Sequence, residues 1–271
     1  MRENFENKYF DKLVVNPNKH EHSEKNLHES IIENVENIGG KHITDFEVAK
    51  TAKEIEIINF VLDEADKILS SYGREKHISI PLENIHILVD GGSEKYTTGN
   101  LKTGGHSTMQ RSVIIDRVKS DLEFSIILFH ELIHLKSYSA IQVLDNGKIE
   151  AYRSGISVRS RDGERKYLKN IEEGIVGLLT EKFYNTLIEK GAFYINREDI
   201  ANNKIEISRK EEIATLNKIV DDIYGKHREQ FKDRDQVLNL FINAQVNGEL
   251  IKLLKLIKST YKIDSLKAKN N

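Results

Sequence analysis

The densest apolar run of the chain, from Phe124 to Leu135, contains two histidines and a glutamate. Ser120 and Glu123 have the spacing of a capping box, so the sequence predicts a helix from about 121 to 137. A helix that is apolar on nearly every side is expected to be buried. Polar groups inside it cost free energy unless they are paired or bound to a metal. The surrounding fold must therefore bring partners to this helix.

The polar residues of the run lie in the segment His130-Glu131-Leu132-Ile133-His134. Residues four apart lie on one face of a helix, so both imidazole rings can reach a single ion. Glu131 lies about 100° round the helix from His130, where its carboxylate can face a water molecule on that ion. Zinc lowers the pKa of such a water towards about 7, and a nearby carboxylate can take its proton. The sequence thus predicts a zinc site with Glu131 as general base. The alternative is a pair of core histidines with backbone or carboxylate partners.

Composition restricts what can hold the metal and what the chain can bind. The 271 residues include no cysteine, so thiolate ligands are excluded and a metal must be held by histidine and carboxylate side chains. Lys and Arg number 41 against 43 Asp and Glu. Because this balance provides no basic excess to hold phosphates, no nucleic-acid partner is expected.

The periodicity of apolar residues predicts the order of the elements. Thr44 and Glu47 have capping-box spacing, which predicts a helix from 44 to about 73. Strands are expected at 78–80, 85–89 and 112–116, and a hairpin of 139–144 and 148–158 about a turn at Asp145-Asn146-Gly147. A helix opening near Asn170 follows, and apolar stripes in 211–225, 236–246 and 249–261 predict a helical C-terminal part. This order indicates an α+β fold.

The first 43 residues differ in composition from the remainder. They are rich in Asn, Glu, Lys and His, which predicts a mobile tail with one short helix that ends near Gly39-Gly40. Residues 44–271 are expected to form a single unit, divided into 44–138 and 139–271 at the start of the hairpin. No apolar stretch has the length of a secretory signal or a membrane span, so a cytoplasmic location without an integral membrane segment is predicted, with export by a leaderless route as the alternative.

The segment His130-Glu131-Leu132-Ile133-His134 resembles the active-site helix of the zincin metallopeptidases. A hairpin and a helix with an acidic residue follow it, an order similar to that of the gluzincin branch. In that branch the third ligand is the Glu of a motif similar to Asn-Glu-x-x-x-Asp/Glu, and the matching stretch here runs from Glu172 to Gly177. The resemblance covers about residues 110 to 185. It implies a zincin-like fold with a small sheet, a buried active-site helix and a mostly helical C-terminal part, and it implies that His130, His134 and Glu173 bind Zn²⁺.

Two positions depart from the family pattern. Glu172 stands where the motif has Asn, and Gly177 stands where it has an acid that hydrogen-bonds a ligand histidine. We expect that role to pass to another carboxylate or to a backbone carbonyl. Asn170 and Glu173 also have the spacing of a helix N-cap and its N3 partner, so Glu173 is either a ligand or part of a cap. The next candidate ligand is Glu172, followed by Asp145 and Glu150.

The resemblance implies that 44–271 is the catalytic unit of a zinc metallopeptidase acting on a peptide or protein substrate. The alternative is a catalytically inactive zincin-like protein that binds a protein partner. The strand at 112–116 is expected to be the sheet edge that pairs with extended substrate. A peptidase also needs a donor for the oxyanion. The candidates, which the sequence does not rank, are Tyr138, Tyr152, Tyr167, Tyr184, Tyr194 and His227.

Overall fold

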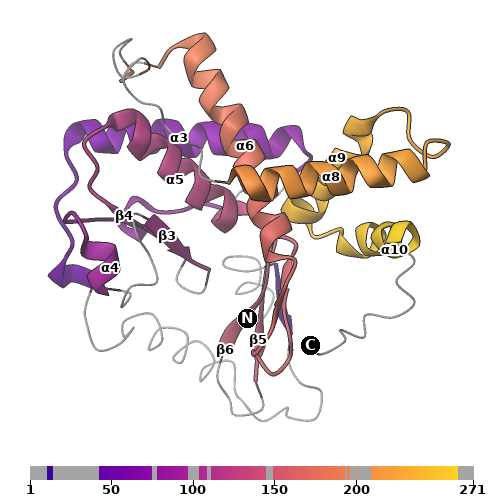
Figure 1. The fold of residues 1–271 in the computed structure, drawn as a ribbon. Helices are drawn as coiled ribbons and strands as arrows, with labels where there is room; N and C mark the ends of the chain where they lie inside the picture. Colours follow the sequence, from indigo (N-terminus) through magenta and orange to yellow (C-terminus); the bar gives the residue numbers. More distant parts are fainter. Residues whose placement is uncertain are drawn as a thin grey trace.

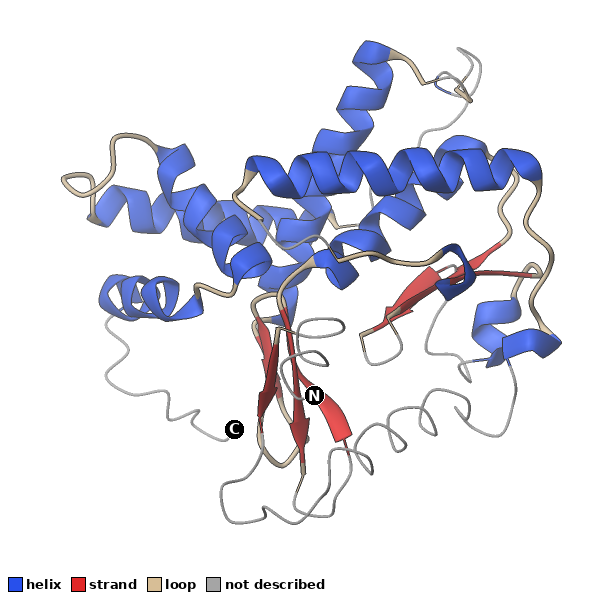
Figure 2. Ribbon diagram, turned by 180° about the vertical axis from the view of Figure 1, so that it is seen from behind, coloured by secondary structure: helices blue, strands red, loops and turns tan. Residues whose placement is uncertain are grey.

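The computed structural model describes residues 11–14, 43–74, 78–96, 104–108, 111–144, 149–192, 194–195, 200 and 209–261. Helices and two small sheets combine in this part of the chain, which confirms the predicted α+β class. Figures 1 and 2 show both sheets on one side of a layer of helices. The predicted short helix before Gly39-Gly40 and the predicted turn at Asp145-Asn146-Gly147 lie outside the described residues.

Helix α5, Asp121–Lys136, is the predicted buried helix. Ser120 is its N-cap, and the Ser120 hydroxyl accepts a hydrogen bond from the backbone N–H of Glu123 at 3.3 Å. The helix packs against α3 (Ala52–Ser71), α6 (Lys169–Lys190) and the three-stranded sheet. Leu128, Phe129 and Leu132 are completely buried. Neighbouring elements therefore enclose α5 on several sides, as its apolar sequence requires.

The three-stranded sheet beside α5 has the strand order β2-β4-β3. Strand β2 (Ile85–Leu88) is parallel to β4 (Ser112–Asp116), and β3 (Gly104–Ser107) is antiparallel to it. The prediction that 112–116 forms the sheet edge is wrong, because β4 lies between two strands and all its residues are buried. Within the described residues, β3 is an outer strand. The strand predicted at 78–80 does not form, although Ile78 and Ile80 are buried.

Helix α3 begins later than the sequence predicts. Its N-cap is Thr51, which forms a capping box with Glu54 through hydrogen bonds of 3.1 and 2.6 Å. The predicted box of Thr44 and Glu47 does not form. That segment lies along β2 instead, where Glu47 makes an antiparallel bridge with Leu88. The chain has two capping-box patterns in succession, Thr44 with Glu47 and Thr51 with Glu54. Because Glu47 pairs with the sheet, the helix starts at the second pattern.

The second sheet has the strand order β1-β5-β6-β7-β8. Strands β5 (Ser139–Val143) and β6 (Ile149–Ser154) form the predicted antiparallel hairpin. The predicted strand 148–158 is broken at Gly155, where a φ of 55° turns the chain into β7 (Ser157–Arg159). Strand β8 is Lys166–Tyr167. Strand β1 (Lys12–Val14) pairs in parallel with β5, so this short part of the predicted tail belongs to the sheet.

Helices α8 (Lys210–Lys226), α9 (Arg234–Asn247) and α10 (Leu250–Tyr261) follow α6 and form the predicted helical C-terminal part. The shorter elements are helix α4 (Gly92–Tyr96) and the 3₁₀ turns η1 (Ile43–Asp45) and η2 (Leu82–Asn84). No helix in the described part of the chain has both the length and the apolar character needed to cross a membrane.

Two glycines of α6, which we call the glycine seam, let α8 approach closely. A side-chain carbon at Gly174 would lie 2.6 Å from the backbone oxygen of Glu212, and one at Gly177 would lie 3.0 Å from Cβ of Arg209. A backbone oxygen can move away only if its helix moves. The glycine seam therefore sets the spacing of the two helices and brings Arg209, at the start of α8, against α6.

We expect Gly174→Ala to lower the free energy of unfolding by about 1–3 kcal/mol, because the added carbon overpacks the contact between α6 and α8. Urea denaturation of the full chain measures this change. The matched control is Gly225→Ala in α8, where an added carbon meets no atom within 4 Å. That variant should be neutral or stabilised by up to about 1 kcal/mol. Equal stability of Gly174→Ala and the wild type would contradict this account of the seam.

Candidate metal centre

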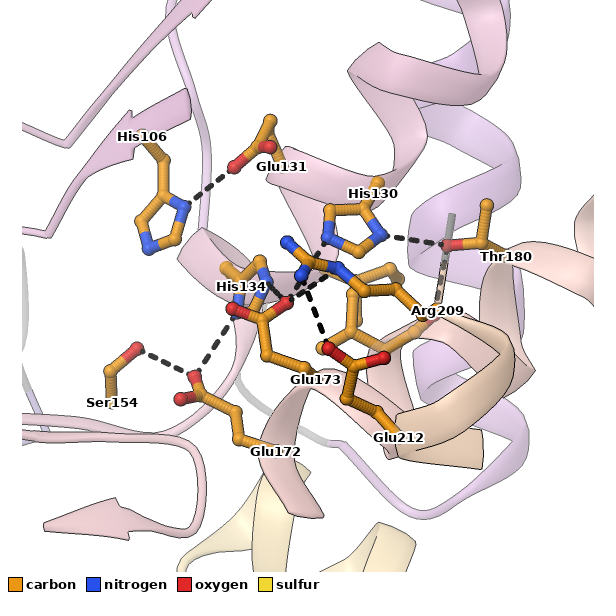
Figure 3. A network of polar contacts seen from close by, with 12 residues as sticks. His106, His130, Glu131, His134, Ser154, Glu172, Glu173, Thr180, Arg209 and Glu212 are labelled. Atoms are coloured by element: carbon orange, nitrogen blue, oxygen red, sulfur yellow. Dashed lines mark hydrogen bonds and ion pairs between the residues drawn. The ribbon is translucent and has the colours of Figure 1, made fainter. Parts of the chain in front are cut away.

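Two histidines of α5 and one glutamate of α6 converge on one point, as Figure 3 shows. Nε2 of His130 and Nε2 of His134 each lie 3.5 Å from Oε2 of Glu173. The three atoms that can act as ligands all lie within 4.8 Å of one another. We call His130, His134 and Glu173 the ligand trio. The fold thus brings together the three residues that the resemblance selects.

The surroundings of Glu173 Oε2 fit a metal ion. This oxygen is buried and has no hydrogen-bond partner among the described residues. Its 3.5 Å separations from the two nitrogens exceed the ordinary hydrogen-bond range of about 2.7–3.2 Å. Zinc binds nitrogen and oxygen at roughly 2.0–2.2 Å, and tetrahedral angles then place neighbouring ligand atoms roughly 3.3–3.5 Å apart. The spacing of the ligand trio therefore suits a shared cation better than direct hydrogen bonds.

A carboxylate fixes the other nitrogen of His134. Nδ1 lies 3.1 Å from Oε1 of Glu172, and the hydroxyl of Ser154 donates to the same oxygen at 3.2 Å. Because an ionised carboxylate only accepts hydrogen bonds, Nδ1 carries a proton, so Nε2 is the nitrogen whose lone pair becomes available to a metal when the ring is neutral. His134 and Glu172 are both buried, so this contact is shielded from water.

The hydroxyl of Thr180 lies beside the other nitrogen of His130, in a longer and weaker contact than that of Glu172 with His134. Thr180 donates to the backbone carbonyl of Val176 at 2.8 Å, and its oxygen lies 3.4 Å from Nδ1 of His130. Since the hydroxyl hydrogen is used on the carbonyl, the oxygen can only accept from Nδ1. Nε2 of His130 is then the nitrogen with the free lone pair. Both histidines thus present the same ring atom to Glu173.

Gly177 lies where α6 meets the start of α8. A side-chain carbon at 177 would lie 3.0 Å from Cβ of Arg209 and 3.1 Å from Cδ1 of Ile213, so the two helices are tightly packed here. The carboxylate that contacts a histidine of the ligand trio is that of Glu172, which lies beside His134. Nε of Arg209 lies 3.3 Å from Oε2 of Glu173. The packing of α8 on α6 therefore brings a cation to the third candidate ligand.

The pKa values of His134 and Glu173 reflect the opposite charges that face each other in the site. Burial acts to lower the pKa of His134, but its contacts with Glu172 and Glu173 raise it to about 10. Burial acts to raise the pKa of Glu173, but its contacts with His130, His134 and Arg209 hold it well below its usual range. A metal ion binds only an unprotonated imidazole nitrogen. A proton and a metal ion therefore compete for Nε2 of His134.

Glu131 has a partner that the sequence analysis missed. Nδ1 of His106, on β3, lies 2.7 Å from Oε2 of Glu131, and the His106 ring stacks on His134 with centroids 4.5 Å apart. Burial acts to raise the pKa of Glu131, but the hydrogen bond with His106 and the charges of the nearby histidines lower it to about 2. The carboxylate is thus ionised, as a general base requires. A single histidine in a strand has no spacing pattern that would have marked it.

The structure also tests the alternatives to Glu173 as a ligand. The N-cap of α6 is Leu168, and no side chain caps this helix, so the predicted cap of Asn170 and Glu173 is wrong. Glu172 contacts Nδ1 of His134, the ring nitrogen that faces away from the ligand trio. Of the more distant candidates, Glu150 pairs with Arg159 at 3.1 Å, and Asp145 lies outside the described residues.

Three of the candidate oxyanion donors have partners elsewhere in the fold. The guanidinium of Arg153 lies over the ring of Tyr138 at 4.4 Å from its centroid. Tyr194 packs edge-on against Phe60, and Nε2 of His227 lies 3.1 Å from the hydroxyl of Thr260. The remaining candidates, Tyr152, Tyr167 and Tyr184, lie on β6, β8 and α6.

Comparison of the chain with protein-family models, with curated proteins and with solved structures finds no match. The chemistry of the site therefore has to be inferred from its own residues. These residues offer two imidazole nitrogens and one carboxylate oxygen to a cation, and a second, ionised carboxylate on the next residue after His130.

We expect Glu172→Ala to weaken zinc binding roughly 10- to 100-fold, because His134 loses the carboxylate that fixes its ring and its proton. A zinc titration in competition with a chromogenic chelator measures the affinity. The matched control is Glu47→Ala, since Glu47 accepts from His86 at the same 3.1 Å distance away from the ligand trio. Unchanged affinity in Glu172→Ala would show that this contact does not support a metal ligand.

Proposed function

We propose that the chain is a zinc-dependent peptidase in which His130, His134 and Glu173 hold the metal and Glu131 is the general base. The fold class and the position of these side chains support this proposal, as does the resemblance of the α5 motif to the zincin metallopeptidases. The substrate we propose is a peptide or protein segment in an extended conformation.

The observation that carries the proposal is the position of Glu173 Oε2. This oxygen is buried and makes no hydrogen bond among the described residues, and Arg209 Nε, 3.3 Å away, is the one arginine or lysine cation beside it in the described part of the chain. Two histidine nitrogens face it at equal distances, and a metal ion would satisfy all three atoms at once. Two histidines and one glutamate are a ligand set that catalytic zinc sites use, with a further position left for water or substrate.

The chemistry of such a site is hydrolysis. Bound zinc would polarise the substrate carbonyl and lower the pKa of the attacking water. Glu131 would accept a proton from this water as it attacks the carbonyl carbon, and would then deliver the proton to the leaving amine. The low pKa of Glu131 keeps the carboxylate ionised, which is the form that can accept a proton. His130 and Glu131 are consecutive residues of α5, so the proposed metal ligand and the proposed base lie on adjacent faces of one helix.

The outer strand beside α5 is the surface on which we propose that substrate lies. The sequence assigns this role to 112–116, but that strand is internal, and β3 takes the outer position in the described sheet. Strand β3 packs against α5 and carries His106, which contacts Glu131. A peptide added along β3 would pass next to the general base.

The alternative function is that of an inactive zincin-like protein that binds a protein partner. Its main support is Gly177, where the family's acidic residue is missing. Glu172 supplies a carboxylate to His134 and so weakens that support. An ionised Glu131 beside the ligand trio also favours an enzyme, because a binding protein has no need of a general base.

We expect Glu131→Gln to retain one zinc ion per chain and to reduce peptide hydrolysis by about 10²- to 10⁴-fold, because the amide cannot accept the water proton. Cleavage of a peptide library, followed by mass spectrometry, provides the assay. The matched control is Glu123→Gln in the first turn of the same helix, which should cleave like the wild type. Hydrolysis by Glu131→Gln at the wild-type rate would contradict the base assignment. A zinc-loaded wild type that cleaves no peptide would favour the inactive binding protein.

A further inference from the structure

His106 reaches Glu131 from a different part of the chain. It lies on β3, where it pairs with Val113 of β4, and its ring is held on one side by stacking against His134 at an interplanar angle of 19°. Nδ1 of His106 lies 2.7 Å from Oε2 of Glu131. Figure 3 shows the imidazole and the carboxylate pointing toward each other across the space between β3 and α5. The ring is thus constrained by the strand, by His134 and by Glu131.

The close approach of β3 to α5 depends on a glycine. A side-chain carbon at Gly104 would lie 2.7 Å from Cγ2 of Ile127, one helical turn before Glu131. The start of β3 can therefore lie directly on α5, and His106 two residues later reaches the carboxylate. The contact follows from the packing of strand and helix, since both residues lie in regular elements.

The distance indicates a hydrogen bond and not a second pair of metal ligands. His106, Glu131 and His134 also offer ligand atoms within 4.8 Å of one another. Two ligands of one zinc ion lie roughly 3.3–3.5 Å apart, however, and 2.7 Å is a typical distance for a charge-assisted hydrogen bond. An ionised Glu131 accepts this bond, so Nδ1 of His106 is the donor.

We propose that His106 is a positioning residue that holds one oxygen of Glu131, so that the other oxygen faces the metal and its water. This inference rests on the proposed function, because it assigns a role in relation to the general base. A glutamate side chain has several rotatable bonds, and restricting them is necessary for a base that must meet a water at one place. The donor is on a separate structural element from the metal ligands, so metal binding and the orientation of the base can be changed independently.

The test uses zinc-loaded full-length protein and acetohydroxamate as the probe, so no substrate has to be known. A hydroxamate binds zinc through its two oxygens, and a carboxylate beside the zinc accepts the proton of its hydroxyl group. Its affinity therefore reports the position of Glu131 without turnover. Affinities are measured for the wild type, His106→Ala, Glu131→Gln and the double variant, which form a double-mutant cycle. Zinc content and melting temperature are measured on the same samples.

We expect His106→Ala to retain one zinc per chain and to weaken acetohydroxamate binding roughly tenfold or more, as for loss of a hydrogen bond to a charged group. In the Glu131→Gln background, the same change should alter affinity by less than about twofold, because the group that His106 positions has lost its proton-accepting role. His106→Asn should restore much of the affinity, since its amide nitrogen can replace Nδ1. The control is His86→Ala on β2, the strand across the sheet from β3, which removes a contact of the same kind with Glu47 and should bind acetohydroxamate like the wild type.

Three results would overturn the positioning role. They are wild-type affinity in His106→Ala, an equal loss in both backgrounds, and loss of zinc in His106→Ala, which would make His106 a metal ligand. A wild type that binds no zinc would contradict the proposed function and the positioning role with it. Coupling between His106 and Glu131 in a protein that cleaves no peptide would support the positioning role and count against peptidase activity.

Discussion

The buried carboxylate of Glu173 is the group on which the account of this protein depends. It faces two histidine nitrogens that are held by their own partners, and its Oε2 has no hydrogen bond in the described part of the chain. Such an arrangement costs free energy unless cations compensate it; Arg209 lies 3.3 Å from this oxygen, and a metal ion would in addition satisfy the two histidine nitrogens. The apolar helix α5 can carry His130 and His134 in the core because α6 presents Glu173 and Glu172 to them. The polar groups of the site are thus paired across helices, while apolar packing around them holds the helices in place.

Packing between elements also determines which side chains support the site. The glycine seam allows α8 to lie against α6 and brings Arg209 to Glu173. Gly104 allows β3 to lie against α5 and brings His106 to Glu131. In both places a missing side chain permits a backbone approach, and a charged or polar residue nearby gains a contact with the site. The candidate metal ligands therefore lie on α5 and α6, and the residues that contact them or Glu131 come from β3, β6, α6 and α8.

Local patterns in the sequence predicted the central part of the fold. The Ser120 cap and the apolar run define α5, and the hairpin of β5 and β6 and the helical C-terminal part follow from periodicity. Errors arose where long-range pairing decides the structure. Bridging to β2 prevents a helix start at Thr44, and the order β2-β4-β3 puts 112–116 in the middle of its sheet. The motif spacing predicted His130 and His134, and the resemblance added Glu173, whereas the contacts of His106 and Thr180 come from elements that only the fold brings together.

The central claim is that the ligand trio holds one zinc ion. Its most direct test is metal analysis by mass spectrometry of the wild type and of Glu173→Ala, each purified without added metal and then dialysed against equimolar zinc. The account predicts close to one zinc per wild-type chain and little in the variant, because a catalytic zinc site requires a third protein ligand. Equal zinc in both proteins would remove Glu173 from the site. A wild type without zinc, even after dialysis, would contradict the account and leave His130 and His134 as core histidines paired with carboxylates.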